Sequence, residues 1–443
     1  MNVGLVAVSG IRVCDAELMK LGMTLPGFVE RSRVIASLPS LGLLTLAAMT
    51  PPPHRVTYLE IPSPGDLADL PGSFDLVAIS SFTAQMPEAY ALARRFRDAG
   101  ALVVLGGLHV TALPDEAEEH ADAVVVGEGE AVWPRLLDDA ERGRLRRRYD
   151  ARSEPFDLAL APVPSFEILD VSRYNRLTVQ TSRGCPWRCT FCASSVLLRE
   201  HYAQKPVARV VSELDRILSI WERPFVEFAD DNAVVRRDFW RALLPELRRR
   251  RVRWFVETDL SVSEDLDLLD EMRRSGCVEV LIGLESPTAA GLDGVEMRRN
   301  WKLHHLPGYV DAVRRVQSRG IRVNACFVLG LDGQGPEVFD DVFSFAERAA
   351  PYDVQITLAT PFPGTPLHER LRSQGRLTAD RAWERYTLFD STFRPDPMSA
   401  EQLAQGFRGL AERLYDGAFT SWRREAFRRA ASARFRAKGG SLR

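Results

Sequence analysis

The feature that most constrains the fold is an alternation of short apolar runs with helical patterns, which occurs twice along the 443 residues. In the first block, from Met1 to about Asp150, the predicted strands are Val3–Val8, Arg55–Ile61, Asp75–Ser80, Leu102–Leu105 and Ala123–Val126. Apolar residues at helical spacing predict helices between them at Leu41–Met49, Pro87–Arg97 and Glu130–Ala140. Strand–helix alternation of this kind is typical of a doubly wound parallel sheet.

The alternation resumes at Arg176, after a proline-containing linker at residues 151–173. A basic run at Arg144–Arg148 precedes this linker, and we interpret it as a solvated face. The predicted strands of the second block are Leu177–Thr181, Phe225–Ala229, Arg253–Glu257, Glu279–Gly283, Arg322–Leu329 and Asp353–Ala359. Six consecutive strand–helix pairs with right-handed crossovers predict a partial (β/α) barrel, whose chemistry gathers at the carboxyl ends of its strands.

The composition is that of a globular chain of two or three domains, with 45% hydrophobic residues, 27% charged residues and a net charge of −2. This charge argues against nucleic-acid binding, and no apolar run approaches the length of a membrane-spanning helix. Six cysteines suit a reducing cytoplasm, and three of them, Cys14, Cys277 and Cys326, are scattered and predicted to be buried free thiols.

The other three cysteines, Cys185, Cys189 and Cys192, lie within eight residues in the spacing Cys-x3-Cys-x2-Cys. Three thiolates on one short loop can bind three irons of a four-iron cluster and leave the fourth iron open to another ligand. A structural zinc site is the alternative, but it needs a fourth ligand, and the nearest histidine, His201, is isolated. The spacing therefore favours a [4Fe–4S] cluster.

The cysteine spacing, with Phe191 just before the last thiol, resembles the signature of the radical S-adenosylmethionine (radical SAM) family. The resemblance implies that SAM binds the open iron. It also implies that carboxylates after the second barrel strand hold the amino group of SAM, and that a segment after the fourth strand holds its ribose. The implied SAM-binding residues are Phe191, Asp230, Asp231, Asn232, Gly283, Glu285 and Ser286. A helix cap at residues 230–232 and a rim carboxylate at Glu285 are the structural alternatives.

The loops of the first block, including Ser9–Ser40, resemble those of the cobalamin-binding domain that precedes many radical SAM domains. The similar phrases are Leu38–Leu44, Gly106–Pro114 and Val126–Glu130. The residues implied to contact cobalamin are Ser80, Ser81, Thr83, Gln85, Gly106, Gly107, His109, Gly127 and Glu128. No Asp-x-His-x-x-Gly motif occurs in residues 1–150, so the resemblance implies cobalamin without a histidine below cobalt, or a degenerate domain that binds nothing.

The chain thus resembles an α/β enzyme with a cobalamin-type domain at 1–150, a linker at 151–173, a partial barrel at 174–375 and a mostly helical extension at 376–443. The extension is similar to that of the subgroup that includes hopanoid methylases, and we expect it to cover the open side of the barrel. Its end, residues 423–443, carries eight Arg/Lys and one Glu. A solvated helix is the expectation there, and a surface for an anionic substrate or lipid is the alternative.

The resemblance implies a cobalamin-dependent C-methyltransferase acting on an unactivated carbon of a small molecule or lipid, reduced by a flavodoxin or ferredoxin. One SAM would methylate cobalamin, and a second SAM would yield the radical that activates the substrate. Three alternatives remain open: a cobalamin-dependent cyclisation, rearrangement or oxidation; a cobalamin-free transfer of the aminocarboxypropyl group of SAM; and a non-catalytic cobalamin or iron–sulfur carrier.

Overall fold

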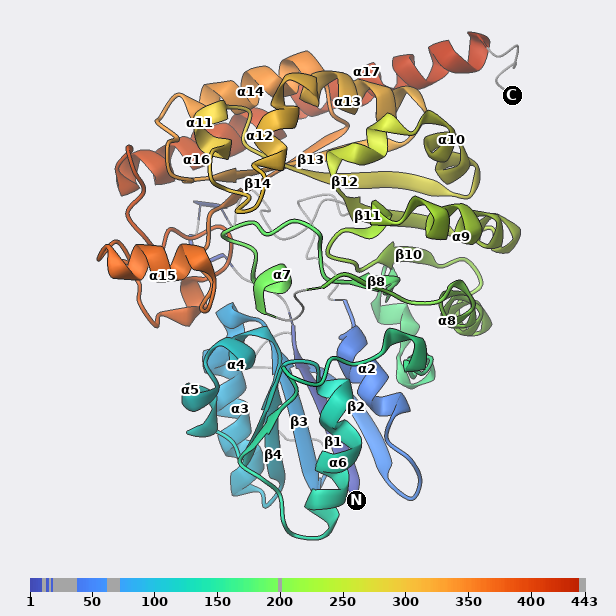
Figure 1. Ribbon diagram of the computed structural model, residues 1–443, viewed down its shortest axis with the longest axis vertical. Helices are drawn as coiled ribbons and strands as arrows, with labels where there is room; N and C mark the ends of the chain where they lie inside the picture. Colours follow the sequence, from blue (N-terminus) through green and yellow to red (C-terminus); the bar gives the residue numbers. More distant parts are fainter. Residues whose placement is uncertain (10–12, 16, 19–37, 62–71, 198–200, 438–443) are drawn as a thin grey trace.

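The computed structural model describes residues 1–9, 13–15, 17–18, 38–61, 72–197 and 201–437. Two parallel six-stranded sheets form the molecule, one in each block of strand–helix alternation. Figure 1 shows the N-terminal sheet in the lower half of the molecule and the second sheet in the upper half. The predicted α/β class, with two parallel sheets followed by C-terminal helices, is confirmed.

The N-terminal sheet has the strand order β2-β1-β3-β4-β5-β6. Its strands are β1 (Asn2–Val8), β2 (Arg55–Ile61), β3 (Leu76–Ser81), β4 (Leu102–Gly106), β5 (Ala123–Val126) and β6 (Arg148–Asp150). Side chains alternate between the faces of each strand, so one face packs on α3 (Met86–Asp98) and the other on α2 (Leu41–Ala48) and α6 (Gly129–Glu141). Both faces are covered, which explains the continuous apolar strands that the sequence shows.

The basic run at 144–148 is mostly solvated, as the sequence predicts, because Arg144, Arg146 and Arg147 are exposed; it also leads into a sixth strand that the sequence did not predict. Arg148 begins β6 and pairs in register with Val124 of β5. Its guanidinium forms ion pairs with Asp115 and Glu118, near α5 (Pro114–Glu118). The run is partly exposed, yet its last residue is fixed by the sheet and by these carboxylates.

The second sheet has the order β14-β13-β12-β11-β10-β7, so β7 and β14 are its two edges and the barrel is partial. Its strands are β7 (Leu177–Val179), β10 (Phe225–Phe228), β11 (Arg253–Thr258), β12 (Cys277–Glu285), β13 (Arg322–Leu329) and β14 (Asp353–Leu358). The helices α8 (Val207–Ile220), α9 (Arg237–Arg250), α10 (Leu266–Arg274), α13 (Tyr309–Ser318) and α14 (Val338–Ala349) form its outer layer. Their apolar stripes and the outward side chains of the strands make one large core.

The C-terminal extension follows α15 (Pro366–Ser373). It consists of residues 374–399, which we term the strap, and of two helices, α16 (Ala400–Tyr415) and α17 (Gly417–Ala437). The strap reaches the open edge of the barrel, where the Leu358 N–H of β14 donates to the Leu388 carbonyl over 2.7 Å. The two helices lie with α13 and α14 at the top of Figure 1. The expectation that the extension covers the open side holds for the strap, whereas α16 and α17 extend the outer layer.

Two sequence expectations fail against this fold. Arg423, predicted to be solvated, is fully buried in α17, where its guanidinium donates to the carbonyls of Leu414 over 2.9 Å and Pro351 over 3.3 Å and so satisfies backbone groups in the interior. Cys14, predicted to be buried, is exposed, since its short segment lies on the surface beside the strap. Within the described ranges, no helix is long and apolar enough to cross a membrane.

Candidate active site

The cysteine loop leaves β7 at the carboxyl edge of the barrel and runs into α7 (Ala193–Leu197) between the two sheets. A two-residue pairing of β8 (Ser182–Arg183) with β9 (Ala203–Gln204) holds the base of this loop. Cys189 is buried, while Cys185 and Cys192 are partly buried. The loop thus presents its three thiols at the end of the barrel where chemistry is expected.

The acidic segment after β10 holds the cysteine loop in place. Asp230 is buried, and its carboxylate accepts hydrogen bonds from the N–H and hydroxyl of Thr181 over 2.7 and 2.8 Å and from the Ser182 N–H. Asp231 accepts from the Gly184 N–H over 2.7 Å and from the Ser194 hydroxyl. Burial raises the pKa of Asp230 to about 6, although the hydrogen bonds from Thr181 and Ser182 act to lower it.

Asn232 completes this segment by contacting a thiol. Its amide nitrogen donates to the Asp259 carboxylate over 2.8 Å and lies 3.8 Å from Cys185 Sγ, within hydrogen-bonding range for sulfur. Asp230, Asp231 and Asn232, three of the residues predicted to bind SAM, therefore position the cysteine loop in this structure. Their contact with the amino group of SAM stays a prediction.

The donor chemistry of the loop fits an iron–sulfur cluster. No group of three His, Cys, Asp or Glu side chains in the described part of the chain converges closely enough to hold a single metal ion. A cluster instead takes one thiolate per iron, so its three ligands must stand apart around it. Burial raises the pKa of Cys185 to about 12, so its ionisation depends on binding to a metal.

Phe191 lies in a small apolar cluster beside the thiols. It packs against a group of buried residues that includes Cys189, Leu367 of α15 and Phe393 of the strap. This cluster covers one side of the cysteine loop and joins it to the C-terminal extension. The predicted contact of Phe191 with SAM is not shown by this packing and stays a prediction.

The end of β12 carries a buried ion pair that the sequence did not indicate. Glu285 has a φ of +63°, at an irregularity of β12 where its register with β13 shifts. Its carboxylate pairs with Lys302 of α12 (Trp301–His305), and Lys302 Nζ also donates to the Gly283 carbonyl over 2.8 Å. A Cβ at Gly283 would stand 2.6 Å from the Glu285 carboxylate, so this pair requires a glycine there.

Burial by itself would lower the pKa of Lys302, but the charges of Glu285 and Cys189 outweigh burial and raise it. Lys302 is therefore a buried cation close to the cysteine loop. Strained backbone at a buried charge is typical of functional sites. Ser286, which follows, is fully buried, and its hydroxyl bonds with the Thr288 hydroxyl in the turn toward α11 (Ala289–Leu292).

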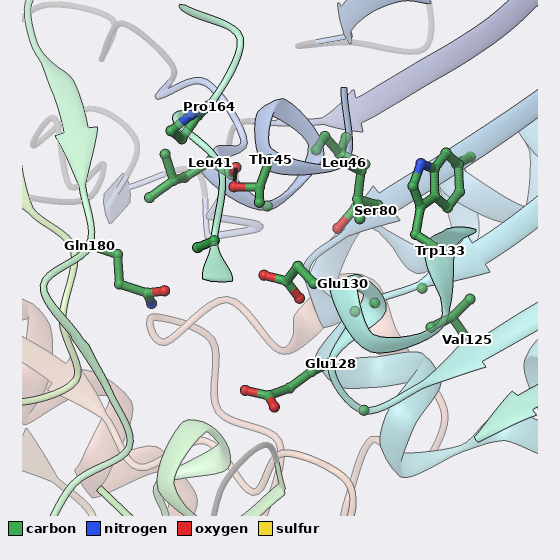
Figure 2. A pocket seen from close by; sticks show the side chains of 18 of the residues that line it. Leu41, Thr45, Leu46, Ser80, Val125, Glu128, Glu130, Trp133, Pro164 and Gln180 are labelled. Carbon is green, nitrogen blue, oxygen red and sulfur yellow. Dashed lines mark hydrogen bonds between the residues drawn. The ribbon is translucent and has the colours of Figure 1, made fainter. Parts of the chain in front are cut away.

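A cavity of about 310 Å³ opens between the N-terminal sheet and the barrel. Figure 2 shows Leu41, Thr45, Leu46, Val125 and Trp133 around it, and the polar residues Glu128, Glu130 and Gln180 form its polar side. The inner wall is mostly apolar, and glycines at the ends of β4 and β5 complete it. Gly107 and Gly127 have φ values of +112° and +86°, which favour glycine and let a ligand approach the backbone.

Five of the nine residues predicted to contact cobalamin line this cavity: Ser80, Gly106, Gly107, Gly127 and Glu128. Four others do not line it: Ser81, Thr83, Gln85 and His109. His109 is buried elsewhere, with Nε2 3.3 Å from the Glu116 carboxylate and its ring edge against Trp383 of the strap. It turns away because the short helix α4 (Leu108–Ala112) directs it toward the C-terminal extension.

The polar side of the cavity is connected directly to the cysteine loop. Arg183, two residues before Cys185, forms ion pairs with Glu128 over 2.7 Å and with Glu130 over 2.8 Å. Burial alone would raise the pKa of Glu130, but Arg183 outweighs it and lowers that pKa. The sequence analysis did not assign four polar residues on this side of the cavity, of which Glu130 and Arg183 stand in or next to the recognised motifs: Glu130, Gln180, Arg183 and Lys205.

Residues 33–137 match the family described as the B12 binding domain, and residues 179–346 match the Radical SAM superfamily. The hopanoid C-2 methylase of Rhodopseudomonas palustris (strain TIE-1) is 30% identical over 357 residues, which is 78% of this chain and 67% of the methylase. The chain belongs to the B12-binding radical SAM enzymes.

Two further comparisons agree with membership of the B12-binding radical SAM enzymes. The bacteriochlorophyllide d C-12(1)-methyltransferase of Chlorobaculum tepidum is 27% identical, over 85% of this chain and 82% of that enzyme. The structure of the radical SAM methyltransferase TsrM from Kitasatospora setae, with cobalamin and a [4Fe–4S] cluster bound, covers 94% of this chain and 90% of its own. Its TM-score is 0.66 at 18% identity, which shows the shared fold.

This B12-binding radical SAM enzyme is a cobalamin-dependent methyltransferase that uses a [4Fe–4S] cluster, SAM and cobalamin. The predictions of family, enzyme class and cofactors are confirmed. The cysteine loop fits the cluster, and the cavity beside it fits a large cofactor with an apolar part and polar edges. The individual residues assigned to SAM and cobalamin remain predictions.

Proposed function

We propose that this methyltransferase adds a methyl group to an unactivated carbon of a small molecule or lipid. Its relatives are named for hopanoids and for bacteriochlorophyllide d, which are ring-bearing molecules of this kind. A flavodoxin- or ferredoxin-type protein would supply the electron. Nothing in the net charge of −2 favours a nucleic-acid substrate.

The observation that supports the proposal is that one cavity is lined by both halves of the molecule. Ser80, Gly106 and Gly127 come from the N-terminal sheet, whereas Gln180 and Arg183 come from the start of the barrel. Cobalamin in this cavity would therefore lie beside the cysteine loop. When bound, the cluster with SAM supplies a radical that removes a substrate hydrogen, and cobalamin supplies the methyl group.

The chain's own residues would position these groups. Arg183 fixes the cysteine loop to Glu128 and Glu130, so the two cofactor sites keep one relative placement. Asp231 and Asn232 hold the loop from the barrel side, and Lys302 and Glu285 place two buried charges near Cys189. We propose that Glu285 accepts from the SAM ribose and that Asp231 faces its amino group.

Transfer of a methyl group from labelled SAM to added cob(I)alamin tests the function without the substrate. The protein should form labelled methylcobalamin and, under reducing conditions, cleave SAM to 5'-deoxyadenosine. Cleavage without any transfer to cobalamin would contradict the methyltransferase mechanism. Screening of hopanoids and chlorophyll-type pigments would then address the substrate class.

Filling the cavity is expected to abolish cobalamin binding and spare the cluster. Gly106→Leu places a Cβ at 3.7 Å from that of Val125, an ordinary contact, and directs its remaining carbons into the cavity. The expected result is loss of bound-cobalamin absorbance with unchanged iron content and thermal midpoint. Gly409→Leu is the matched control, because nothing lies within 4 Å of a Cβ there. Full cobalamin binding by Gly106→Leu would contradict the assignment.

Bound cob(II)alamin is expected to lack an axial nitrogen from the protein and from its own displaced base. No Asp-x-His-x-x-Gly motif occurs in residues 1–150, and no histidine is among the cavity-lining residues in the described part of the chain. Electron paramagnetic resonance should therefore show no superhyperfine splitting from axial nitrogen. Splitting that persists after His109→Ala would point to the base of cobalamin, and splitting lost in that variant would point to His109.

A further inference from the structure

One surface beside the cysteine loop is basic, partly apolar and unused by the functions assigned above. It consists of Met297, Arg298, Arg299, Trp301, His304 and His305, which we term the 297–305 surface. Met297 is 43% exposed, and Arg298, Arg299 and His304 are exposed. The nine residues 297–305 contain three Arg/Lys, two His and no acidic residue, in a chain whose net charge is −2.

The backbone of this surface is joined directly to the cluster ligands. Glu296 forms an antiparallel bridge with Cys189, and the chain on either side extends it. The Thr190 N–H donates to the Val295 carbonyl over 2.8 Å, and the Met297 N–H donates to the Arg188 carbonyl over 2.9 Å. Met297 therefore stands one residue from a position that pairs with a thiol ligand.

Glu296 explains why the basic side chains face outward and stay unpaired. It is 2% exposed, and its carboxylate accepts from the backbone N–H groups of Arg298 over 3.0 Å and Arg299 over 2.7 Å. The Glu296 carboxylate therefore points inward, and its hydrogen bonds are formed with backbone N–H groups and not with the arginine side chains. Neither Arg298 nor Arg299 forms an ion pair with another residue that the structure describes, so their charges are available to a partner.

A stack of rings connects the same surface with the cysteine loop. Trp187, which lies between Cys185 and Cys189, stacks on Trp301 at 4.7 Å between ring centres, and Trp301 stacks on His305 at 4.2 Å. Trp187 is also fixed by its indole N–H, which donates to Asp259 over 2.8 Å. The stack provides a short, rigid and well-packed route from the partly exposed Trp301 and His305 to the loop.

We propose that the 297–305 surface is the docking site of an acidic one-electron carrier protein that reduces the cluster. The proposal rests on the proposed function, which requires a protein reductant. Arg, Met and Trp are enriched in protein interfaces, and an exposed apolar residue rimmed by charge marks an interaction site. In this reaction one electron passes from the reduced carrier to the cluster, so the carrier is oxidised by one electron and the cluster is reduced by one electron.

The surface is tested with the reconstituted full-length protein and two probes, a bacterial flavodoxin and a bacterial ferredoxin, each reduced photochemically. The double variant Arg298→Glu/Arg299→Glu reverses the exposed charge without touching the backbone hydrogen bonds to Glu296. Reduction of the cluster is followed by its absorbance and by its electron paramagnetic resonance signal. Arg248→Glu/Arg249→Glu is the matched control, an exposed arginine pair at the end of α9, away from the carboxyl edge of the barrel.

At low salt, the wild type should be reduced rapidly by at least one carrier, and added salt should slow that reduction. The 298/299 variant should be reduced about tenfold more slowly or worse, with little dependence on salt, while the control pair behaves like the wild type. Arg298→Lys/Arg299→Lys should restore most of the rate. Dithionite, which needs no docking site, should reduce all four proteins at the same rate.

Wild-type rates for the 298/299 variant with both carriers would overturn the proposal. It would also be overturned if neither carrier reduced a wild-type cluster that dithionite reduces, or if the variant lost SAM affinity, which would assign the surface to the SAM site. Dithionite-driven SAM cleavage and methyl transfer to cobalamin test the proposed function separately. Their failure in the wild type would count against the function and not against the surface.

Discussion

The variant Cys185→Ala/Cys189→Ala/Cys192→Ala is expected to lose all of about four irons per chain and every trace of SAM cleavage. The three thiols are the ligands that the loop offers, and no group of three His, Cys, Asp or Glu in the described part of the chain converges closely enough to hold a single metal ion in their place. Iron and sulfide analysis after anaerobic reconstitution, with absorbance near 400 nm, measures the loss.

Two of the three remaining cysteines, Cys14 and Cys277, provide the control. Cys14 is exposed at the surface, and Cys277 is buried at the start of β12, so Cys14→Ala/Cys277→Ala should keep a full complement of iron. Cobalamin binding should survive in the triple variant, because the apolar wall of the cavity belongs to the N-terminal sheet. A four-iron cluster retained by the triple variant would refute the ligand assignment.

Removing the charge of Lys302 should produce the second-largest effect, a loss of about 3–5 kcal/mol in the free energy of unfolding for Lys302→Met. The side chains of Lys302 and Glu285 are each 9% exposed, so the substitution leaves a carboxylate buried without its cation. The Gly283 carbonyl also loses its 2.8 Å donor. Denaturant unfolding of the metal-free protein measures the change without any contribution from the cluster.

The double variant Lys302→Met/Glu285→Gln separates charge from packing. It removes both charges, so it should recover much of the stability lost by Lys302→Met alone. Glu285→Ala by itself should weaken SAM binding by about 10- to 100-fold at unchanged iron content, because the ribose would lose the acceptor proposed for it. Equal SAM affinity would leave Glu285 as the structural partner of Lys302, and an unfolding free energy of Lys302→Met equal to the wild type would contradict the buried pair.

The sequence was sufficient for features that depend on neighbouring residues. The prediction of three thiol ligands follows from the spacing of Cys185, Cys189 and Cys192, which the structure places on one loop. Eleven of the twelve strands in the two large sheets were predicted within a few residues, because buried parallel strands are continuous apolar runs bounded by turn residues. The exception, β6, is three residues long and begins with a charged residue, so it has no such pattern.

Motifs also located the ends of strands, but they did not fix where the side chains point. Gly107 and Gly127 border the cavity as expected, whereas His109, in the same motif as Gly107, packs against Trp383. Residues 109 and 383 meet because the strap crosses the chain to reach the N-terminal half. No pattern near position 109 in the sequence indicates that Trp383 of the strap packs against His109.

The sequence by itself determined the two parallel sheets, the loop that carries the three thiols and the glycines at strand ends, because each rests on a periodicity or a spacing within one short segment. Only the tertiary structure decided which charges meet. Arg183 and Glu128 are 55 residues apart, and Asp230 and Thr181 are 49 apart. Even Lys302 and Glu285, 17 apart, meet only because α12 folds back over β12. Such pairs form when crossovers bring the carboxyl ends of different strands to one edge, and a local pattern carries no information about that arrangement.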